Sequence, residues 1–269
     1  MGDDIGNMNP VTANFTKVDG GEGMTFADYA VNCDEEDPDA VKGWGANGDT
    51  FNVYTAQGDF KSSYIYCPQW MADALSAPEE EGGFGYTVTK GWYNSNDGEF
   101  KTNCNTNEVG FGNGVVAKST MAGAKITFSG AVKPGPTPID IGQFTIAGNV
   151  SAKTINLGEI IVNCDEEDPD AVTGWAANGD TINVYTPSGD YDKGFIYCPQ
   201  WLSDALSAPE EEGGFGYPVA KGWYAMTDET FQDCYNTKRQ FIGGEGFVAK
   251  SGMSGAVMTI KSALATEEK

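Results

Sequence analysis

The sequence predicts an all-β protein of two tandem homologous domains, each an antiparallel β-sandwich or small barrel with one short helix. Three observations lead to this prediction. Long segments occur twice along the chain, apolar residues alternate with a period of two, and 36 glycines are spread through the 269 residues. Alternation is typical of half-buried strands, and frequent glycine is typical of tight turns.

The internal repeat defines the domains. Residues 31–41 recur unchanged as residues 162–172, and residues 73–86 recur as residues 204–217. Two copies of this length predict tandem globular domains rather than a solenoid. We expect a first domain at residues 1–133, which includes an N-terminal segment at 1–20, and a second domain at residues 139–269. Alternating prolines predict a short, stiff linker at residues 134–138.

Several segments have the period of strands. In residues 50–55, Phe51 and Val53 share one face, and the second copy places Ile182 and Val184 there. An aromatic residue exchanged for a β-branched one indicates a buried strand face. Glycine turns and the alternation of residues 60–66 predict a hairpin. Further strands are expected at residues 86–93, 114–118, 124–132, 144–150 and 154–163.

One short helix is expected in each copy. In the first copy it begins near Pro68, because proline suits the first helical position. Trp70, Ala74 and Leu75 fall on one side of such a helix. Pro78 and the glycines that follow it are expected to end the helix.

The chain is strongly acidic, with 39 Asp and Glu against 16 Lys and Arg and a net charge of −23. Such a surface repels phosphate backbones and anionic lipids, so we expect no nucleic-acid partner. No stretch resembles a transmembrane span, so we expect no membrane insertion. Histidine is absent, which excludes Ser–His and Cys–His catalysis and His-ligated metal sites. The single arginine, Arg239, cannot supply an anion site built from several guanidinium groups.

Cysteine occurs three times in each copy. Six cysteines without a C-x-x-C pair, in a glycine-rich acidic chain, favour disulfides over zinc or redox chemistry. Buried free thiols in a cytosolic protein are the alternative. Disulfides imply an extracellular or cell-surface chain whose signal peptide has been removed. If each copy forms one internal bridge, one thiol is left over, and the sequence leaves its partner open. The disulfide candidates are Cys33, Cys67, Cys104, Cys164, Cys198 and Cys234.

An acidic cluster recurs in both copies. Hard cations prefer several oxygen ligands from loops, so Ca²⁺ is the one cofactor that the sequence suggests. The spacing is not that of an EF-hand, and a solvated acidic loop is the alternative. The candidate metal ligands are Asp34, Glu35, Asp37, Asp39, Asp165, Glu166, Asp168 and Asp170.

Aromatic residues also recur at matching positions. Exposed Trp and Tyr rings stack on sugars, so Trp92, Tyr93, Trp223 and Tyr224 are candidates for ligand binding. The alternative is that these rings form the core, because each of them buries a large apolar area.

Short motifs occur in the same order along both copies, namely Gly48-Asp49-Thr50, Gly91-Trp92-Tyr93, residues 112–119 (GNGVVAKS) and residues 126–132 (ITFSGAV) in the first. In this order they resemble β-rich repeat units of bacterial secreted and cell-surface proteins of unassigned function. The resemblance covers most of each copy, although the second copy has residues 261–264 (KSAL) in place of the closing motif. It implies an exported, non-catalytic β protein and assigns no functional residues.

These observations favour an extracellular, non-catalytic structural or adhesive surface protein, including a subunit of a fibre or pilus-like assembly. Residues 11–17 contain an expected strand, which either adds to a neighbour's sheet edge or is the first strand of domain one. A carbohydrate-binding protein with one aromatic-lined site per domain is the alternative, so the expected partners are further copies of the chain or a surface glycan. No enzyme is expected, and a carboxylate-based hydrolase is the remaining catalytic alternative.

Overall fold

The computed structural model is mostly β, and every strand pair among its described residues is antiparallel. None of the sheets closes on itself within the described residues. The structure describes residues 2–4, 9–12, 15–16, 24–31, 50–54, 59–109, 114–118, 125–128, 131–132, 137–142, 145–149, 153–163, 179–186, 190–252 and 255–260.

The first half of the chain contains a five-stranded and a three-stranded sheet. The five-stranded sheet has the order β2 (Asn9–Thr12), β10 (Gly114–Lys118), β6 (Thr50–Tyr54), β7 (Phe60–Cys67) and β8 (Gly91–Asn94). The three-stranded sheet has the order β1 (Gly2–Asp4), β11 (Lys125–Phe128) and β5 (Tyr29–Val31). Two small ribbons pair β4 (Met24–Thr25) with β9 (Glu108–Val109) and β12 (Ala131–Val132) with β3 (Phe15–Thr16).

The second half has sheets of the same two orders. The five-stranded sheet runs β14 (Thr145–Gly148), β21 (Gly246–Lys250), β17 (Thr181–Tyr185), β18 (Tyr191–Cys198) and β19 (Gly222–Ala225). The three-stranded sheet runs β13 (Thr137–Asp140), β22 (Val257–Ile260) and β16 (Ile160–Val162), and β15 (Ile155–Asn156) pairs with β20 (Gln240–Phe241). Each strand of the two large sheets therefore takes the place of a strand of the first half.

The N-terminal segment pairs within its own chain. Strand β1 pairs with β11, and β2 pairs with β10. Residues 11–12 and 15–16 of the strand expected at 11–17 belong to β2 and β3, whose partners also come from the first half. Two roles were expected for this segment, and its pairing fits the one in which it supplies the first strand of the first half.

The predicted helix after Pro68 is confirmed as α3 (Gln69–Leu75), and its counterpart is α5 (Gln200–Leu206). The buried face differs from the expectation, because Met71 and Ala72 are buried whereas Ala74 is exposed. A 3₁₀ turn follows each helix, at η2 (Glu79–Glu81) and η5 (Glu210–Glu212). No described helix has the length and apolar character needed to cross a membrane.

The core of the second half lies between its two large sheets. Ile182, Phe195 and Trp223 from the five-stranded sheet pack in one cluster with Ile160 and Met258 from the three-stranded sheet. Side chains alternate along a strand, so the neighbours of these residues point to the opposite, outer face. The indole Nε1 of Trp223 donates to the carbonyl oxygen of Ile160 at 2.8 Å, which joins β19 to β16.

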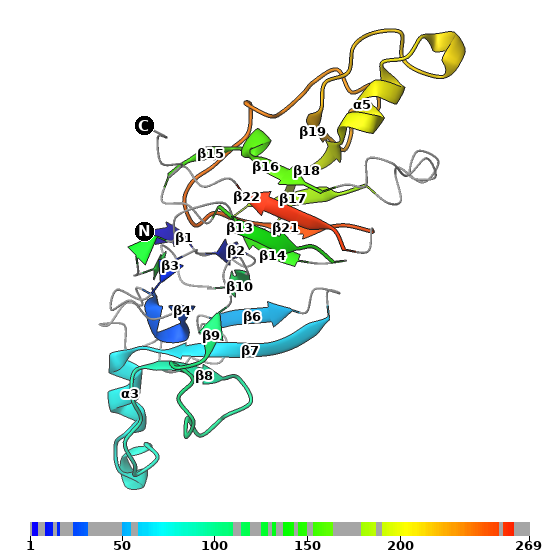
Figure 1. Ribbon diagram of the computed structural model, residues 1–269. Coiled ribbons are helices and arrows are strands. Elements are labelled where there is room, and N and C mark those ends of the chain that lie inside the picture. The colour runs from blue at the N-terminus through cyan, green and yellow to red at the C-terminus, as the bar shows by residue number, and fades with distance from the viewer. Residues whose placement is uncertain are drawn as a thin grey trace.

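The two halves contact each other through the outer faces of their five-stranded sheets. Strand β2 lies beside β14 and β21, and β10 lies beside β14. In β10, β14 and β21, inward-facing alanines alternate with Val116, Ile146 and Val248, which therefore point outward. These three outward-facing side chains are nevertheless buried. They are buried because the other half of the chain covers this part of the outer face. The two halves thus pack directly, and they extend in opposite directions from this contact (Figure 1).

The boundaries of several expected elements need correction. Residues 137–138 of the expected linker begin β13, and residues 134–136 lie outside the described part. The strand expected at 86–93 begins only at Gly91. The strand expected at 154–163 is split into β15 and β16 by η3 (Leu157–Glu159). The expectation at 114–118 is confirmed as β10.

Candidate functional site

The aromatic residues proposed for ligand binding are part of the interior. Trp92 and Tyr93 are each 1% exposed, Trp223 is 0% exposed and Tyr224 is 1% exposed. Trp92 Nε1 donates to the carbonyl oxygen of Tyr29 at 3.0 Å, as Trp223 does to Ile160. Rings buried to this degree cannot stack on a sugar. These four residues therefore belong to the core, which was the alternative expectation.

Four of the six cysteines lie in the described part of the chain, and all four are free thiols. Burial raises the pKa of both Cys67 and Cys198 to about 12, and for Cys198 the nearby Cys234 adds to the effect. Cys33 and Cys164 lie outside the described residues, so the structure describes no bridge that involves either of them.

The expected calcium ligands at residues 34–39 and 165–170 also lie outside the described part. Among the described residues, no three Asp, Glu or Cys side chains form a group able to hold a metal ion.

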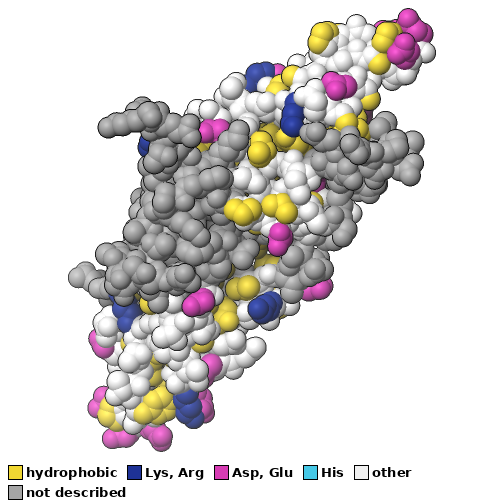
Figure 2. Space-filling model, in the orientation of Figure 1, with side chains coloured by type: hydrophobic (Ala, Val, Ile, Leu, Met, Phe, Trp, Pro, Cys, Tyr) yellow, Lys and Arg dark blue, Asp and Glu magenta, His cyan; other side chains and the backbone are white. Residues whose placement is uncertain are grey.

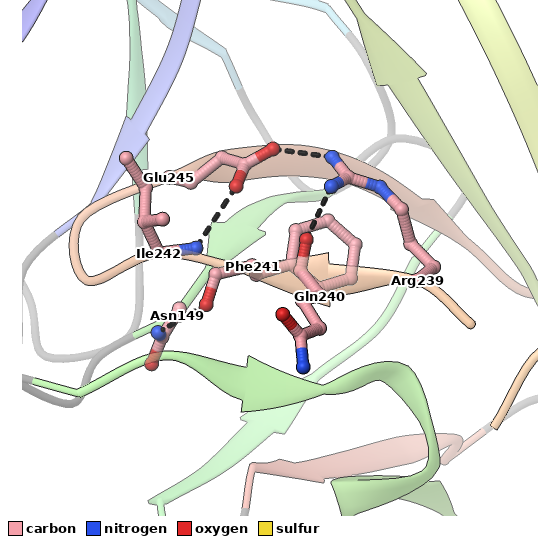
Figure 3. A network of polar contacts seen from close by, with 6 residues as sticks. All are labelled: Asn149, Arg239, Gln240, Phe241, Ile242 and Glu245. Atoms are coloured by element: carbon pink, nitrogen blue, oxygen red, sulfur yellow. Dashed lines mark hydrogen bonds and ion pairs between the residues drawn. The ribbon is translucent and has the colours of Figure 1, made fainter. Parts of the chain in front are cut away.

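The single arginine belongs to a structural network (Figure 3). Its guanidinium donates to Glu245 and to the carbonyl oxygen of Gln240, and it lies 4.4 Å from the centre of the Phe241 ring. Glu245 also accepts the backbone N–H of Ile242 at 3.0 Å. Arg239 therefore pairs within its own loop and is not a docking point for an anion.

Two arms are the first repeated surface feature. The first arm is residues 68–90 and the second arm is residues 199–221; each contains the helix, the 3₁₀ turn and the return segment. Their inner sides pack on the outer faces of the sheets, where Met71 and Val88 contact the cluster of Ile65 and Tyr93. The second arm makes the matching cluster with Leu202, Val219, Ile196 and Tyr224.

A short set of hydrogen bonds fixes the shape of each arm. Ser76 Oγ donates to the Ala72 carbonyl oxygen at 2.7 Å and accepts the Val88 N–H at 2.8 Å. The Phe84 N–H donates to the Leu75 carbonyl oxygen at 2.8 Å. Ser207 makes the same two bonds in the second arm, at 2.7 Å and 2.8 Å. The two arms thus share one internal framework.

Glycine is required where each arm turns back. Gly82 and Gly213 each have a φ of 90°, a region that favours glycine. A Cβ on Gly83 would lie 2.1 Å from the Ala77 carbonyl oxygen, and Gly214 stands in the same position against Ala208. The return segment can therefore approach the helix only when this residue has no side chain.

Each arm carries its charge at the tip. Glu79, Glu80 and Glu81 are exposed, as are their counterparts at 210–212. The arms extend from opposite ends of the molecule, and Asp and Glu side chains gather at both ends (Figures 1 and 2). Phe84 and Tyr86 stack 5.6 Å apart, half-buried, beside the first tip, and the second arm repeats this pair with Phe215 and Tyr217.

The second repeated surface feature is a strip of the outer sheet face that lies between the arm and the contact with the other half of the chain. In the second half we call it the outer strip: Asn183, Tyr185, Tyr191, Gly194 and Met226, all on the outer face of the five-stranded sheet. Tyr191 is 57% exposed and Met226 is 50% exposed. Tyr185 lies edge-on to Tyr191, with ring centres 6.2 Å apart. The counterpart strip of the first half is Asn52, Tyr54, Phe60, Ser63 and Ser95.

Comparison with protein families, curated proteins and solved structures finds no match.

Sequence reasoning did not select the residues of the outer strip. The alternation of β18 by itself does not place Tyr191 opposite Tyr185, because an irregularity after Val184 shifts the register of the pair. The signal available in the sequence was the recurrence of an aromatic residue beside the hairpin, as Phe60 and as Tyr191. The arms and the strips are thus two surface features that recur in both halves.

Proposed function

We propose that this chain is an extracellular, non-catalytic structural or adhesive surface protein that acts through two equivalent ends. The pair of arms carries the proposal. They have nearly the same sequence and the same internal hydrogen bonds, and they extend from opposite ends of the molecule. A protein with two equivalent ends can join two neighbours, and repetition of this contact builds a chain of copies.

We also infer that the two halves are tandem homologous domains of the β-sandwich type. The strand orders of the two large sheets correspond in the two halves, and the bond from tryptophan to the facing sheet recurs. A core that takes side chains from both sheets is characteristic of a sandwich. Packing of the two domains on each other holds the arms apart, as two-ended binding requires.

The charge of the arms limits how copies associate. Three exposed carboxylates at one tip repel three at another, and little of this repulsion is screened at low salt. Two tips associate only when a cation lies between them or when the partner is basic. Carboxylate oxygens are ligands that Ca²⁺ accepts, so calcium is the cation to test.

Sedimentation velocity of the full chain, with calcium or with a chelator, tests the proposal. The tip variant replaces all six tip residues, at 79–81 and 210–212, by Gln. The control neutralises exposed acidic residues away from the tips (Glu108→Gln and Asp140→Asn) in the same background. Large species that form with calcium in the natural and control chains, and disappear in the tip variant, support the proposal. A monomer under every ionic condition contradicts it.

A second candidate is a carbohydrate-binding protein with one aromatic-lined site per domain. The exposed rings of Phe60 and Tyr191, 59% and 57% exposed, favour it. Each stands beside a second ring on an open sheet face, at Tyr54 and Tyr185. A glycan array probed with the full chain tests this candidate, and the absence of any bound glycan excludes it.

A further inference from the structure

We propose that the outer strip of the second half binds one unit of a neutral saccharide, and that its counterpart in the first half binds it far more weakly. The inference rests on the carbohydrate-binding candidate above and names its site.

The strip is uncovered between two covered regions of the same sheet face. On one side, the second arm covers Ile196 and Tyr224. On the other side, the first half covers Ile146 and Val248, which lie on the outer face and are buried. Asn183 is the register partner of both Val248 and Gly194, and the Met226 N–H bonds the Gly194 carbonyl oxygen at 2.9 Å. These residues form one row across the open part of the sheet.

Three heteroatoms converge over Gly194. The position that a Cβ would occupy lies 2.5 Å from the Tyr191 hydroxyl, 2.4 Å from Met226 Sδ and 2.9 Å from Asn183 Oδ1. A side chain at this position would separate these atoms, so the arrangement requires glycine. The first half has Ser63 at the matching position, with Phe60 in place of Tyr191 and Ser95 in place of Met226. It therefore lacks both the glycine and the hydroxyl.

The chemistry of the strip fits a sugar. The exposed Tyr191 ring offers an apolar face held edge-on by Tyr185. Among the described residues, neither the Tyr191 hydroxyl nor the Asn183 amide has a hydrogen-bond partner, so both are free to bind sugar hydroxyls. A pyranose ring has an apolar face, which would stack on the Tyr191 ring. It also has a rim of hydroxyl groups, which would hydrogen-bond the Tyr191 hydroxyl and the Asn183 amide.

Charge and size argue against other occupants. Asp190 and Asp192 are exposed beside Tyr191, and the chain has a net charge of −23, so an acidic sugar or a phosphate is repelled. Two exposed apolar side chains are few for the centre of a protein interface, which buries roughly 800 Å² per partner. A neutral saccharide is the occupant that remains.

Titration calorimetry of the full chain tests the site, with neutral hexasaccharides of glucose, mannose, galactose, xylose and N-acetylglucosamine as probes. One dominant site per chain is expected. Tyr191→Ala is expected to weaken binding by about tenfold or more, which is about 1.4 kcal/mol, because it removes the exposed ring face on which the sugar would pack. Gly194→Ser is expected to weaken it too, and Tyr191→Phe by less than Tyr191→Ala. The matched variant Phe60→Ala alters the weak counterpart strip and is expected to leave the affinity of the dominant site unchanged.

The possible results distinguish a failure of this site from a failure of the carbohydrate-binding candidate. If a hexasaccharide binds and Tyr191→Ala leaves the affinity unchanged in a chain with natural near-UV circular dichroism, this site is refuted while the carbohydrate-binding candidate stands. If no hexasaccharide and no array glycan binds, both fail. If Phe60→Ala weakens binding as much as Tyr191→Ala does, the assignment to the second half is overturned.

Discussion

The indole Nε1 of Trp223 donates to the carbonyl oxygen of Ile160 at 2.8 Å, across the interface of the two large sheets. Both residues are 0% exposed. Trp92 and Tyr29 make the same bond in the first half at 3.0 Å. This bond links the two sheets that enclose each core.

Trp223→Phe is expected to lower the free energy of unfolding by about 2 kcal/mol or more, because it leaves the carbonyl without this donor and opens a cavity. Denaturant unfolding followed by circular dichroism measures the change. Trp201→Phe is the control, since the Trp201 Nε1 is buried without a hydrogen-bond partner in the described structure and its loss costs less. Equal costs for the two substitutions would contradict the role given to the Trp223 bond.

Glycine substitutions in the arm are expected to differ sharply. Gly82→Ala meets no atom within 4 Å and is expected to cost about 1 kcal/mol, through its positive φ alone. Gly83→Ala forces a contact with the Ala77 carbonyl and is expected to open the arm. Hydrogen exchange of the Phe84 amide reports this opening, since that N–H bonds the Leu75 carbonyl oxygen. Similar protection in the two variants would show that the turn is not tightly packed.

The contact between the halves gives a third prediction. Val248→Asp places a charge on the buried outer face of β21 and is expected to separate the halves, with a cost of about 3 kcal/mol or more. Asn183→Asp lies opposite it in the register, on the open part of the same face, and is expected to keep them together. Small-angle X-ray scattering measures the separation. An unchanged radius of gyration for Val248→Asp in a folded chain would disprove the contact.

The described cysteine thiols are expected to differ in their rates of alkylation. Burial raises the pKa of Cys67 and Cys198 to about 12, so near pH 8 both stay protonated and are expected to resist iodoacetamide. Among the four described cysteines, the half-buried Cys234 is expected to react first. Timed alkylation and peptide mass spectrometry measure the rates. Rapid labelling of Cys67 in the folded chain would contradict its burial.

The same shift predicts alkaline destabilisation. An unfolded thiol has a pKa of about 8.5, below the folded value, so the neutral thiols contribute stability below that pH. This contribution is lost as the pH rises toward about 12. Burial also raises the pKa of Tyr29 and Tyr224, which adds to the loss. The free energy of unfolding is expected to fall above pH 9, and less steeply in a Cys67→Ala and Cys198→Ala variant.

Much of the fold follows from local pattern. The repeat, the strand at β6, its hairpin partner β7 and the short helix were predictable from alternation and turn residues. Side-chain hydrogen bonds altered other elements. Residues 86–90 are not a strand, since the Val88 N–H bonds Ser76 Oγ and not a neighbouring strand. The Glu159 carboxylate accepts the Asn156 N–H at 2.7 Å and caps the 3₁₀ turn that splits residues 154–163.

The surfaces were less predictable than the fold. Alternation alone does not say which face of a sheet a second domain covers, so the burial of Val248 and the exposure of Tyr191 needed the tertiary structure. The burial of Trp92 and Trp223 was similarly open, because tryptophan serves in cores and in sugar sites alike.

The proposal of two equivalent ends is tested most directly by neutralising one end at a time. Glu79, Glu80 and Glu81 are replaced by Gln in one variant, and residues 210–212 in another. Sedimentation with calcium is predicted to show long assemblies for the natural chain, species no larger than dimers for either single-end variant, and monomers when both ends are changed. A single-end variant that assembles to the size of the natural chain, or a natural chain that stays monomeric, would contradict the account.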